Sequence, residues 1–268
     1  MNKAVKIGFV GGGNMAEAII KGITSQGSKD ILVSEPGEKR RGYLRDNYGV
    51  KTSGFNIDVI SHCSIIILAV KPQVMGEILD EISSEVTEEK TIVSIAAGIT
   101  LSYLSSRLKT KKLIRVMPNT PAIVGEGMTV ISMCECFSER DILVVREIFM
   151  SIGRIITLPE KYMNIVTALS GSGPGFISLF AEAMIDAGIS RGLGRDDATT
   201  LMTQTLLGTA KILESGIGTG KLRDMVTSPG GTTAAGLEVF KKEEFTDIIK
   251  AAVDAAANRA EELGRKED

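Results

Sequence analysis

Tryptophan is absent from the sequence, and only 4% of the residues are aromatic. Histidine occurs once, as His62, and cysteine three times, as Cys63, Cys134 and Cys136. An odd number of cysteines in a chain of 268 residues argues against a disulfide framework, so we expect thiols in a reducing compartment. Cys134 and Cys136 are too few for a zinc site and His62 is distant in sequence, so no metal site is predicted.

Neither sign of charge dominates, since 31 Lys and Arg against 33 Asp and Glu give a net charge of −2 and a pI near 5.7. A nucleic-acid or anionic-membrane partner is therefore not expected. No hydrophobic run approaches the ~20 apolar residues of a membrane helix, and the first run ends at Gly11, too early for a signal peptide. We expect a cytoplasmic protein.

The first part of the chain alternates short β-branched runs with segments of helical periodicity. Near-continuous apolar runs are typical of parallel strands covered on both faces, and their alternation with helices predicts βαβ units. The expected strands are 4–10, 31–34, 64–70, 91–95, 113–116, 128–133 and 154–158, and the expected helices are 14–26, 38–48, 73–84, 101–108 and 138–151. The predicted fold class is α/β with a doubly wound parallel sheet.

After Glu160 the pattern changes to helices alone. Helical periodicity covers 174–187, 195–213, 233–241 and 245–263, without a sustained strand signal. We therefore predict two domains, 1–160 with the sheet and 161–268 all-helical. The helical part has several apolar stripes to bury in roughly a hundred residues, which favours a homodimer or a larger homo-oligomer over a monomeric bundle.

A glycine-rich turn follows the first expected strand and opens the first expected helix. The run Gly11, Gly12, Gly13, Asn14, Met15, Ala16 fits G-x-G-x-x-A in its required context. Gly11 permits the tight turn, Gly13 lets a pyrophosphate approach the backbone, and the helix N-terminus offers unpaired N–H groups. This predicts a Rossmann-like dinucleotide-binding domain, with a merely structural turn as the weaker alternative.

The end of the second expected strand, at Ser34 and Glu35, bears on the choice of coenzyme. Glu35 could bond the 2′-hydroxyl of the adenosine ribose, which favours NAD, or be a solvated loop residue. Ser34 together with one of the basic residues Lys39, Arg40 and Arg41 could instead hold a 2′-phosphate. We predict NADP(H) as the preferred cofactor and keep NAD(H) as the alternative.

Three further loops follow strands at the edge where ligands of open α/β sheets bind. They are Ala69-Val70-Lys71-Pro72, Ala96-Ala97-Gly98 and Met117–Pro121. Their small residues leave room for a nicotinamide ring, and Asn119 could bond its carboxamide or the substrate. Lys71 is either a surface lysine or a residue near the nicotinamide ribose.

Two glycine-containing segments stand out in the helical part. Thr227–Thr233 (TSPGGTT) leads into an expected helix, so N–H groups from Gly231 to Thr233 and the Ser228 hydroxyl could hold a carboxylate. A helix start without a ligand is the plain alternative. The glycines of Leu169–Phe176 either permit close backbone approach near the nicotinamide or form a flexible joint.

Together these segments resemble pyrroline-5-carboxylate reductase over essentially the whole chain. The resemblance rests on IGFVGGGNMAEAI at 7–19, LAVKPQ at 68–73, VSIAAGIT at 93–100, RVMPNTP at 115–121, ALSGSGPGF at 168–176 and DMVTSPGGTTAAGL at 224–237. It implies NAD(P)H-dependent reduction of 1-pyrroline-5-carboxylate to L-proline, and a helical substrate-binding domain that interlocks with a second subunit. Family members often have a His-Pro pair near residues 216–220, which this chain lacks, so the shape of that loop is open.

The resemblance also implies site residues by position. Cofactor contacts would come from Gly11, Gly12, Gly13, Asn14, Met15, Ser34, Asn56, Ala69, Val70, Lys71, Pro72, Ala97 and Asn119. Substrate contacts would come from Ser228, Gly230, Gly231, Thr232 and Thr233.

The chemistry of C=N reduction is compatible with these residues. An iminium is already electrophilic, so positioning can supply most of the acceleration, and no histidine base is required. We expect the Thr233 hydroxyl to bond the imine nitrogen as the catalytic residue. A β-hydroxyacid dehydrogenase, one alternative, would need a lysine that Gly171–Leu179 lacks. The carboxylate cradle argues against the other alternative, a non-catalytic dinucleotide-binding regulator.

Overall fold

The computed structural model describes residues 6–27, 30–134, 137 and 139–265. The chain divides into two compact units, one formed by residues 1–172 with 255–268 and the other by residues 173–254. These units are defined by packing alone. The division into a cofactor-binding domain, 1–160, and a helical substrate-binding domain, 161–268, remains a prediction.

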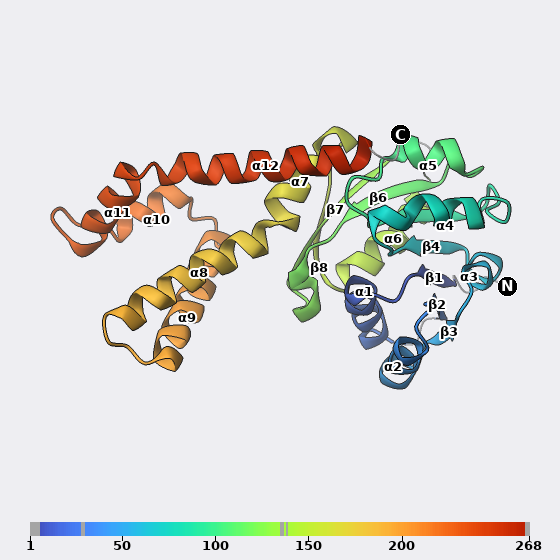
Figure 1. Cartoon of the computed structure of the whole chain (residues 1–268), viewed down its shortest axis with the longest axis horizontal. Helices are drawn as coiled ribbons and strands as arrows, with labels where there is room; N and C mark the ends of the chain where they lie inside the picture. The colour runs from blue at the N-terminus through green and yellow to red at the C-terminus, as the bar shows by residue number, and fades with distance from the viewer. Residues whose placement is uncertain (1–5, 28–29, 135–136, 138, 266–268) are drawn as a thin grey trace. The chain divides into compact units, whose positions relative to one another are not determined.

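The first unit is built on an eight-stranded sheet with the order β3-β2-β1-β4-β5-β6-β7-β8. Its strands are β1 (Ile7–Val10), β2 (Ile31–Ser34), β3 (Lys51–Ser53), β4 (Ile65–Leu68), β5 (Thr91–Ser94), β6 (Leu113–Met117), β7 (Gly127–Met133) and β8 (Gly153–Thr157). The helices between them are α1 (Asn14–Ser25), α2 (Glu38–Tyr48), α3 (Asn56–His62), α4 (Met75–Ile82), α5 (Leu101–Arg107) and α6 (Glu139–Met150) (Figure 1).

The sheet is doubly wound, as the sequence predicted. From β1 the chain proceeds outward to β2 and β3 on one side, and to β4, β5 and β6 on the other, with parallel pairing throughout these strands. The order therefore reverses between β1 and β4. In open α/β sheets this switch point is where the loops diverge and leave a binding crevice.

One strand departs from the expected wholly parallel sheet. β7 pairs antiparallel with β6, whereas β8 is parallel to β7. The physical reason is the length of the connection: residues 118–126 contain only the short 3-10 turn Thr120–Val124, and a parallel crossover needs a dozen or more residues. The segment β7–α6–β8 then forms an ordinary βαβ unit.

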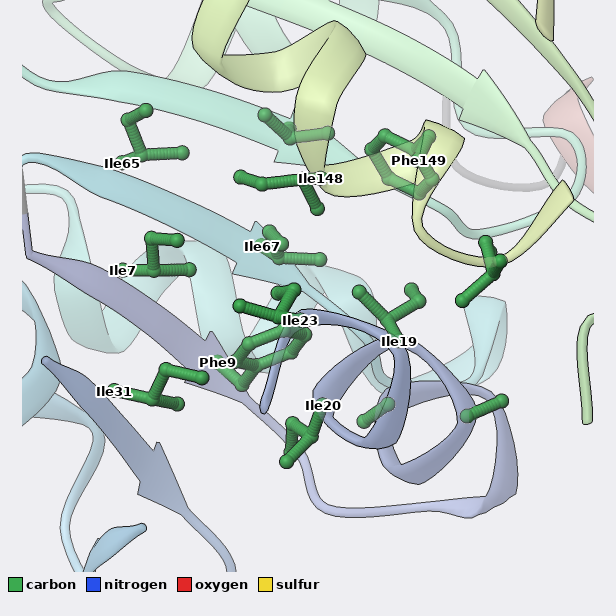
Figure 2. Close-up of a cluster of buried hydrophobic side chains, with 14 of the residues drawn as sticks. Ile7, Phe9, Ile19, Ile20, Ile23, Ile31, Ile65, Ile67, Ile148 and Phe149 are labelled. Atoms are coloured by element: carbon green, nitrogen blue, oxygen red, sulfur yellow. The ribbon is translucent and has the colours of Figure 1, made fainter. Parts of the chain in front are cut away.

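The core lies on both faces of the sheet. On one face the alternate strand residues Ile7, Phe9, Ile31, Ile65 and Ile67 pack with Ile19, Ile20 and Ile23 of α1 and with Ile148 and Phe149 of α6 (Figure 2). On the other face Val10, Ile66 and Leu68 pack with residues of α3, α4 and α5. Successive residues of a strand point to opposite faces, so burial on both faces explains the continuous apolar runs.

Two short elements, β3 and α3, were not expected from the sequence. β3 is three polar residues, Lys51–Ser53, at the edge of the sheet. α3 is only seven residues long and buries Val59 and Ile60. Neither is long enough to show a clear period, and β3 forms because the adjacent edge of β2 supplies its hydrogen-bond partners.

Beyond the sheet the chain is helical, as predicted. A 3-10 turn (Glu160–Tyr162), α7 (Met163–Val166) and a π-helical turn (Thr167–Gly171) lead into α8 (Gly173–Ser190), α9 (Arg195–Glu214), α10 (Thr219–Met225), α11 (Thr232–Lys242) and α12 (Phe245–Arg265). The sequence did not reveal α10, which follows Gly216 (φ 91°) and begins after Gly218. Within the described residues, no helix is long and apolar enough to cross a membrane, and the cytoplasmic location stays a prediction.

The cysteines differ from one another. Cys63 is a free thiol in the core, and burial raises its pKa to about 11. Cys134 is disulfide-bonded, which departs from the expectation of thiols throughout. Cys136 lies outside the described residues.

Glu17 of α1 ties α2 to the first helix. Its carboxylate accepts hydrogen bonds from Arg40 (Nη2, 2.6 Å), Tyr43 (Oη, 2.9 Å) and Tyr48 (Oη, 2.7 Å). Burial raises the pKa of Glu17, but the three hydrogen bonds and the charge of Arg40 outweigh it and hold the pKa below the ordinary value of 4.5. The same contact to Glu17 raises the pKa of Tyr48.

Replacing Glu17 by Gln should lower the free energy of unfolding by roughly 1–3 kcal/mol at pH 7, the usual worth of hydrogen bonds to a charged group. A carboxyl whose folded pKa is depressed stabilises the fold above its unfolded pKa, and the contribution disappears as the pH falls through the folded pKa. Chemical denaturation from pH 7 to pH 3 should therefore show a difference between wild type and Glu17→Gln that shrinks below about pH 4.5. The exposed Glu126→Gln serves as the control, and a difference independent of pH would contradict the prediction.

Candidate functional site

The turn between β1 and α1 is shaped by the protein's own packing at its first two glycines. Gly11 has a φ of 96°, and a Cβ there would lie 2.7 Å from the carbonyl oxygen of Ala69. A Cβ on Gly12 would lie 2.8 Å from Cδ1 of Leu44. The Gly11 N–H donates to the carbonyl of Ser34 at 2.9 Å. The Gly11 position therefore requires glycine before any ligand is considered, whereas a side chain at Gly12 would have to displace the end of the buried Leu44 side chain.

Gly13 is different, because no protein atom explains its lack of a side chain. Apart from its chain neighbours and the backbone of α1 itself, no heavy atom of the described residues lies within 4 Å of the position its Cβ would take, and the residue is exposed. Gly13 is the N-cap of α1, and no side chain caps this end of the helix. The first N–H groups of α1, from Asn14 and Met15, thus have an open approach, which fits a pyrophosphate.

Glu35 follows β2, and both of its carboxylate oxygens are used inside the protein. Oε2 accepts the Gly12 N–H at 3.1 Å, and Oε1 accepts the Gly37 N–H at 3.0 Å. The carboxylate therefore bridges the glycine-rich turn and the loop after β2. The sequence offered a ribose contact or a solvated loop residue for Glu35, and did not indicate this bridge.

The adjacent arginines point in different directions. Arg40 donates from Nε to the Gly12 carbonyl at 2.6 Å and is bound to Glu17, so it belongs to the frame of the turn. Arg41 donates from Nη1 to the carbonyls of Glu35 (2.7 Å) and Pro36 (2.8 Å). Of these two guanidinium groups, that of Arg41 is the one held at the carboxyl end of β2.

Ser34 and Asn56, expected together near the adenosine ribose, are in contact. The Ser34 Oγ donates to Oδ1 of Asn56 at 2.8 Å, and Nδ2 of Asn56 donates to Glu81 at 2.7 Å. Ser34 is only 1% exposed, whereas Asn56, the first residue of α3, is half-buried. Ser34 thus lies beneath Asn56 and orients it.

The loop after β4 lies directly beside the glycine-rich turn. The Ala69 N–H donates to the Val10 carbonyl at 2.8 Å, and Val70 Cγ1 would lie 3.1 Å from a Cβ on Gly11. Lys71 is exposed at the start of the 3-10 turn Pro72–Val74. Ala69 and Val70 are therefore next to the turn, as expected for the ends of neighbouring parallel strands.

The loop after β5 contains Ala97 and leads into α5. The Ala96 N–H donates to Ser94 Oγ at 3.3 Å, and the Leu101 N–H donates to Oε1 of Glu160 at 2.7 Å. The same carboxylate pairs with the buried Arg115 at 3.2 Å. Burial lowers the pKa of Arg115, while the hydrogen bond and charge of Glu160 oppose that shift. This ion pair fixes the far end of the loop.

Asn119, after β6, holds the π-helical turn Thr167–Gly171. Its Nδ2 donates to Ser170 O and Oγ, both at 3.2 Å, and its Oδ1 accepts the Met128 N–H at 2.8 Å. π-helical turns are rare and frequent at functional sites. Both ends of this amide are engaged within the protein, so the expected bond of Asn119 to nicotinamide or substrate stays a prediction. The pairing with Ser170 had no signal in the sequence.

The second unit carries the other predicted site, at the start of α11. Gly231 is the N-cap, with its N–H bonded to the Ser228 carbonyl at 3.0 Å, and no side chain caps the helix. Gly230 has a φ of 68°, and the Ser228 hydroxyl lies over Gly231. Thr232 and Thr233 form the first turn of the helix. The predicted substrate residues are thus gathered at one helix N-terminus.

His62 is exposed at the end of α3, where its Nδ1 donates to the Asp58 carbonyl at 2.8 Å. In the part of the chain that the structure describes, no group of three or more His, Cys, Asp or Glu side chains could hold a metal ion.

Two family models match this chain, one in the part that contains the sheet and one in the helical part. The model described as "Pyrroline-5-carboxylate reductase dimerisation" matches residues 160–263, and the model described as "NADP oxidoreductase coenzyme F420-dependent" matches residues 6–98.

Curated relatives and solved structures match along the whole length. A pyrroline-5-carboxylate reductase of Synechocystis sp. is 38% identical over 98% of this chain and 100% of its own, and one of Arabidopsis thaliana is 39% identical over 98% and 97%. A crystal structure of the Plasmodium falciparum pyrroline carboxylate reductase with NADP bound is 33% identical, with a TM-score of 0.88 over 97% of this chain and 98% of that one. The chain belongs to the pyrroline-5-carboxylate reductase family.

Proposed function

We propose that this protein reduces 1-pyrroline-5-carboxylate to L-proline with NAD(P)H, the last step of proline biosynthesis. The observation that carries the proposal is that the glycine-rich segments 11–16 and 227–233 each open a helix. A glycine N-cap alone does not mark a ligand site, because α2, α9 and α10 have one as well. α1 begins after Gly13 and α11 begins after Gly231, and no side chain caps either helix. Such ends bind anions, and this reaction requires two, the pyrophosphate of a dinucleotide and the carboxylate of an imino acid.

The cofactor would be held by the loops of the first unit. Gly11, Gly12, Gly13, Asn14 and Met15 bind the pyrophosphate, Asn56 with Ser34 beneath it lies at the adenosine ribose, and Ala69, Val70, Lys71, Pro72, Ala97 and Asn119 surround the nicotinamide side. The residues fit this group because Gly13 is exposed and no other part of the described chain lies within 4 Å of the position that its Cβ would take. When bound, the reduced nicotinamide supplies a hydride to the carbon of the C=N bond.

The substrate would be held by the first turn of α11. The N–H groups of Thr232 and Thr233 and the Ser228 hydroxyl bind the carboxylate. The Gly231 N–H, which the sequence also offered, is bonded to the Ser228 carbonyl and shapes the turn. The Thr233 hydroxyl bonds the ring nitrogen and relays the proton that this nitrogen gains as the C=N bond is reduced. Because the iminium is already electrophilic, orientation is the main contribution of these residues, and a histidine base is not needed.

The first test is consumption of NADPH or NADH by purified protein with racemic 1-pyrroline-5-carboxylate. We expect rapid oxidation with L-proline as the product. Cofactor binding without oxidation would instead identify a dinucleotide-binding regulator. Oxidation of β-hydroxyacids is not expected, since Gly171–Leu179, the π-helical turn and the start of α8, holds no lysine to act as a base.

Thr233→Ala should lower kcat/KM on the order of 10²-fold, as expected for loss of a group that assists proton transfer. Thr233→Ser keeps the hydroxyl and should retain most of the activity. Steady-state kinetics of the two variants, with circular dichroism to verify folding, makes the comparison. Wild-type kinetics in a folded Thr233→Ala variant would remove Thr233 from the mechanism.

For the coenzyme we propose a preference for NADP(H), with NAD(H) as the alternative. The Glu35 carboxylate is bonded to two backbone N–H groups and is not free for a ribose 2′-hydroxyl. Arg41 is held at the end of β2, and a guanidinium is well suited to a phosphate. The Plasmodium falciparum relative has NADP bound.

Arg41→Ala should raise the KM for NADPH about tenfold, because one charge-assisted contact to the 2′-phosphate is lost. The KM for NADH should change little, since NADH has no such phosphate. Lys39→Ala, an exposed neighbour on α2, is the matched control. An equal effect of Arg41→Ala on both coenzymes would contradict the assignment.

We propose that the protein is a homodimer, or a larger homo-oligomer, formed through its helical part. Among the described residues of the second unit, only Ala198 and Met202 are buried hydrophobic residues, while large apolar side chains such as Leu179, Leu201 and Val239 are exposed. A fold of this kind gains its core from a partner. Light scattering should give at least twice the chain mass of 28.6 kDa, and a monomer at micromolar concentration would contradict the proposal.

A further inference from the structure

The loop after β5 is in backbone contact with the last turns of α12. Gly98 has a φ of 82°, and a Cβ there would lie 2.9 Å from the Gly264 nitrogen and 3.1 Å from the Ala260 carbonyl oxygen. In the other direction, a Cβ on Gly264 would lie 2.6 Å from the carbonyl oxygen of Gly98. Both glycines are buried at this contact.

The contact depends on two small residues on one face of α12. Ala260 and Gly264 are four residues apart, so they lie one above the other on the same side of the helix. Ala260 is 3% exposed. Without larger side chains at these two positions, the helix backbone can approach the loop backbone directly. Residues 255–268 belong to the same compact unit as the sheet, so this packing is internal to that unit.

Ala97 lies in the middle of this loop. On one side the Ala96 N–H is bonded to Ser94, and on the other the Leu101 N–H is bonded to Glu160. Between these two anchors Gly98 is in close contact with the backbone of α12. A displacement of α12 or an added atom at Gly264 would therefore move the Ala97 backbone.

We propose that Gly264, with Ala260, is a positioning residue for the cofactor: the last turn of α12 sets the Ala96–Gly98 loop, and through it the binding of the nicotinamide half of the coenzyme. This inference rests on the proposed function, which places Ala97 on the nicotinamide side. In a doubly wound sheet the strands β4 to β6 serve the second mononucleotide, so the effect is confined to that half. Gly264 itself touches no ligand.

Gly264→Val and the milder Gly264→Ala test the proposal by direct binding. The added Cβ meets backbone atoms of Gly98, which cannot move aside as a flexible side chain would. We expect the Kd of NADPH to rise on the order of tenfold in Gly264→Val, and less in Gly264→Ala, because displacements near 1 Å have large effects on a bound ring. The Kd of adenosine 2′,5′-bisphosphate, which lacks the nicotinamide half, should stay at the wild-type value.

Glu262→Ala is the matched control, since Glu262 is exposed on the same last turns of α12 and pairs with Arg259 at the surface. It should bind both probes as wild type does. Equal NADPH affinity in folded Gly264→Val and wild type would overturn the inference, and so would an equal loss for both probes, which would indicate a general disturbance of the fold. If wild type bound neither probe, the proposed function itself would fail, which is a distinct result.

Discussion

The close approach of the glycine-rich turn to its neighbours is the constraint on which the first unit depends. Gly11 lies against the Ala69 carbonyl at the point where the strand order reverses, and Gly12 lies against Leu44 and is bonded to Glu35. A side chain at either position would separate β1 from β4 or α2. Because both sides of the switch point meet at this turn, it also fixes where the loops after β2 and β4 lie relative to the first turn of α1.

Several charged and polar side chains that the sequence offered as ligand contacts have structural partners within the protein. Glu35 bridges two backbone N–H groups, and Arg40 connects Gly12 to Glu17. Asn119 uses its amide to hold the π-helical turn. A polar group close to a bound cofactor must itself be oriented, and these contacts supply that orientation before a ligand arrives. The residues left open toward solvent, among them Gly13 and Lys71, are then the better candidates for direct contact.

The helical part, unlike the unit built on the sheet, has few buried residues in the single chain. α8, α10 and α11 contain no buried residue in the single chain, so local periodicity gives these helices without giving them a core. The helix start that we propose for the substrate carboxylate therefore lies on an element without a buried residue in the single chain. If the apolar helix faces are buried in an oligomer, as we propose, that assembly also fixes the position of this helix start.

The sequence alone determined the doubly wound sheet, the bounds of most helices to within one or two residues, and the glycine-rich segments that open α1 and α11. Those features depend on local periodicity and on glycine at fixed spacing, and both can be read within one continuous segment of the sequence. Tertiary structure alone decided the reversed direction of β7, the short elements β3 and α3, and the partners of Glu35, Asn119 and Gly264. Each of these depends on which distant segments meet. β3 forms on the edge of β2. A side chain is excluded at Gly264, in the last turn of α12, because the Gly98 backbone packs against it.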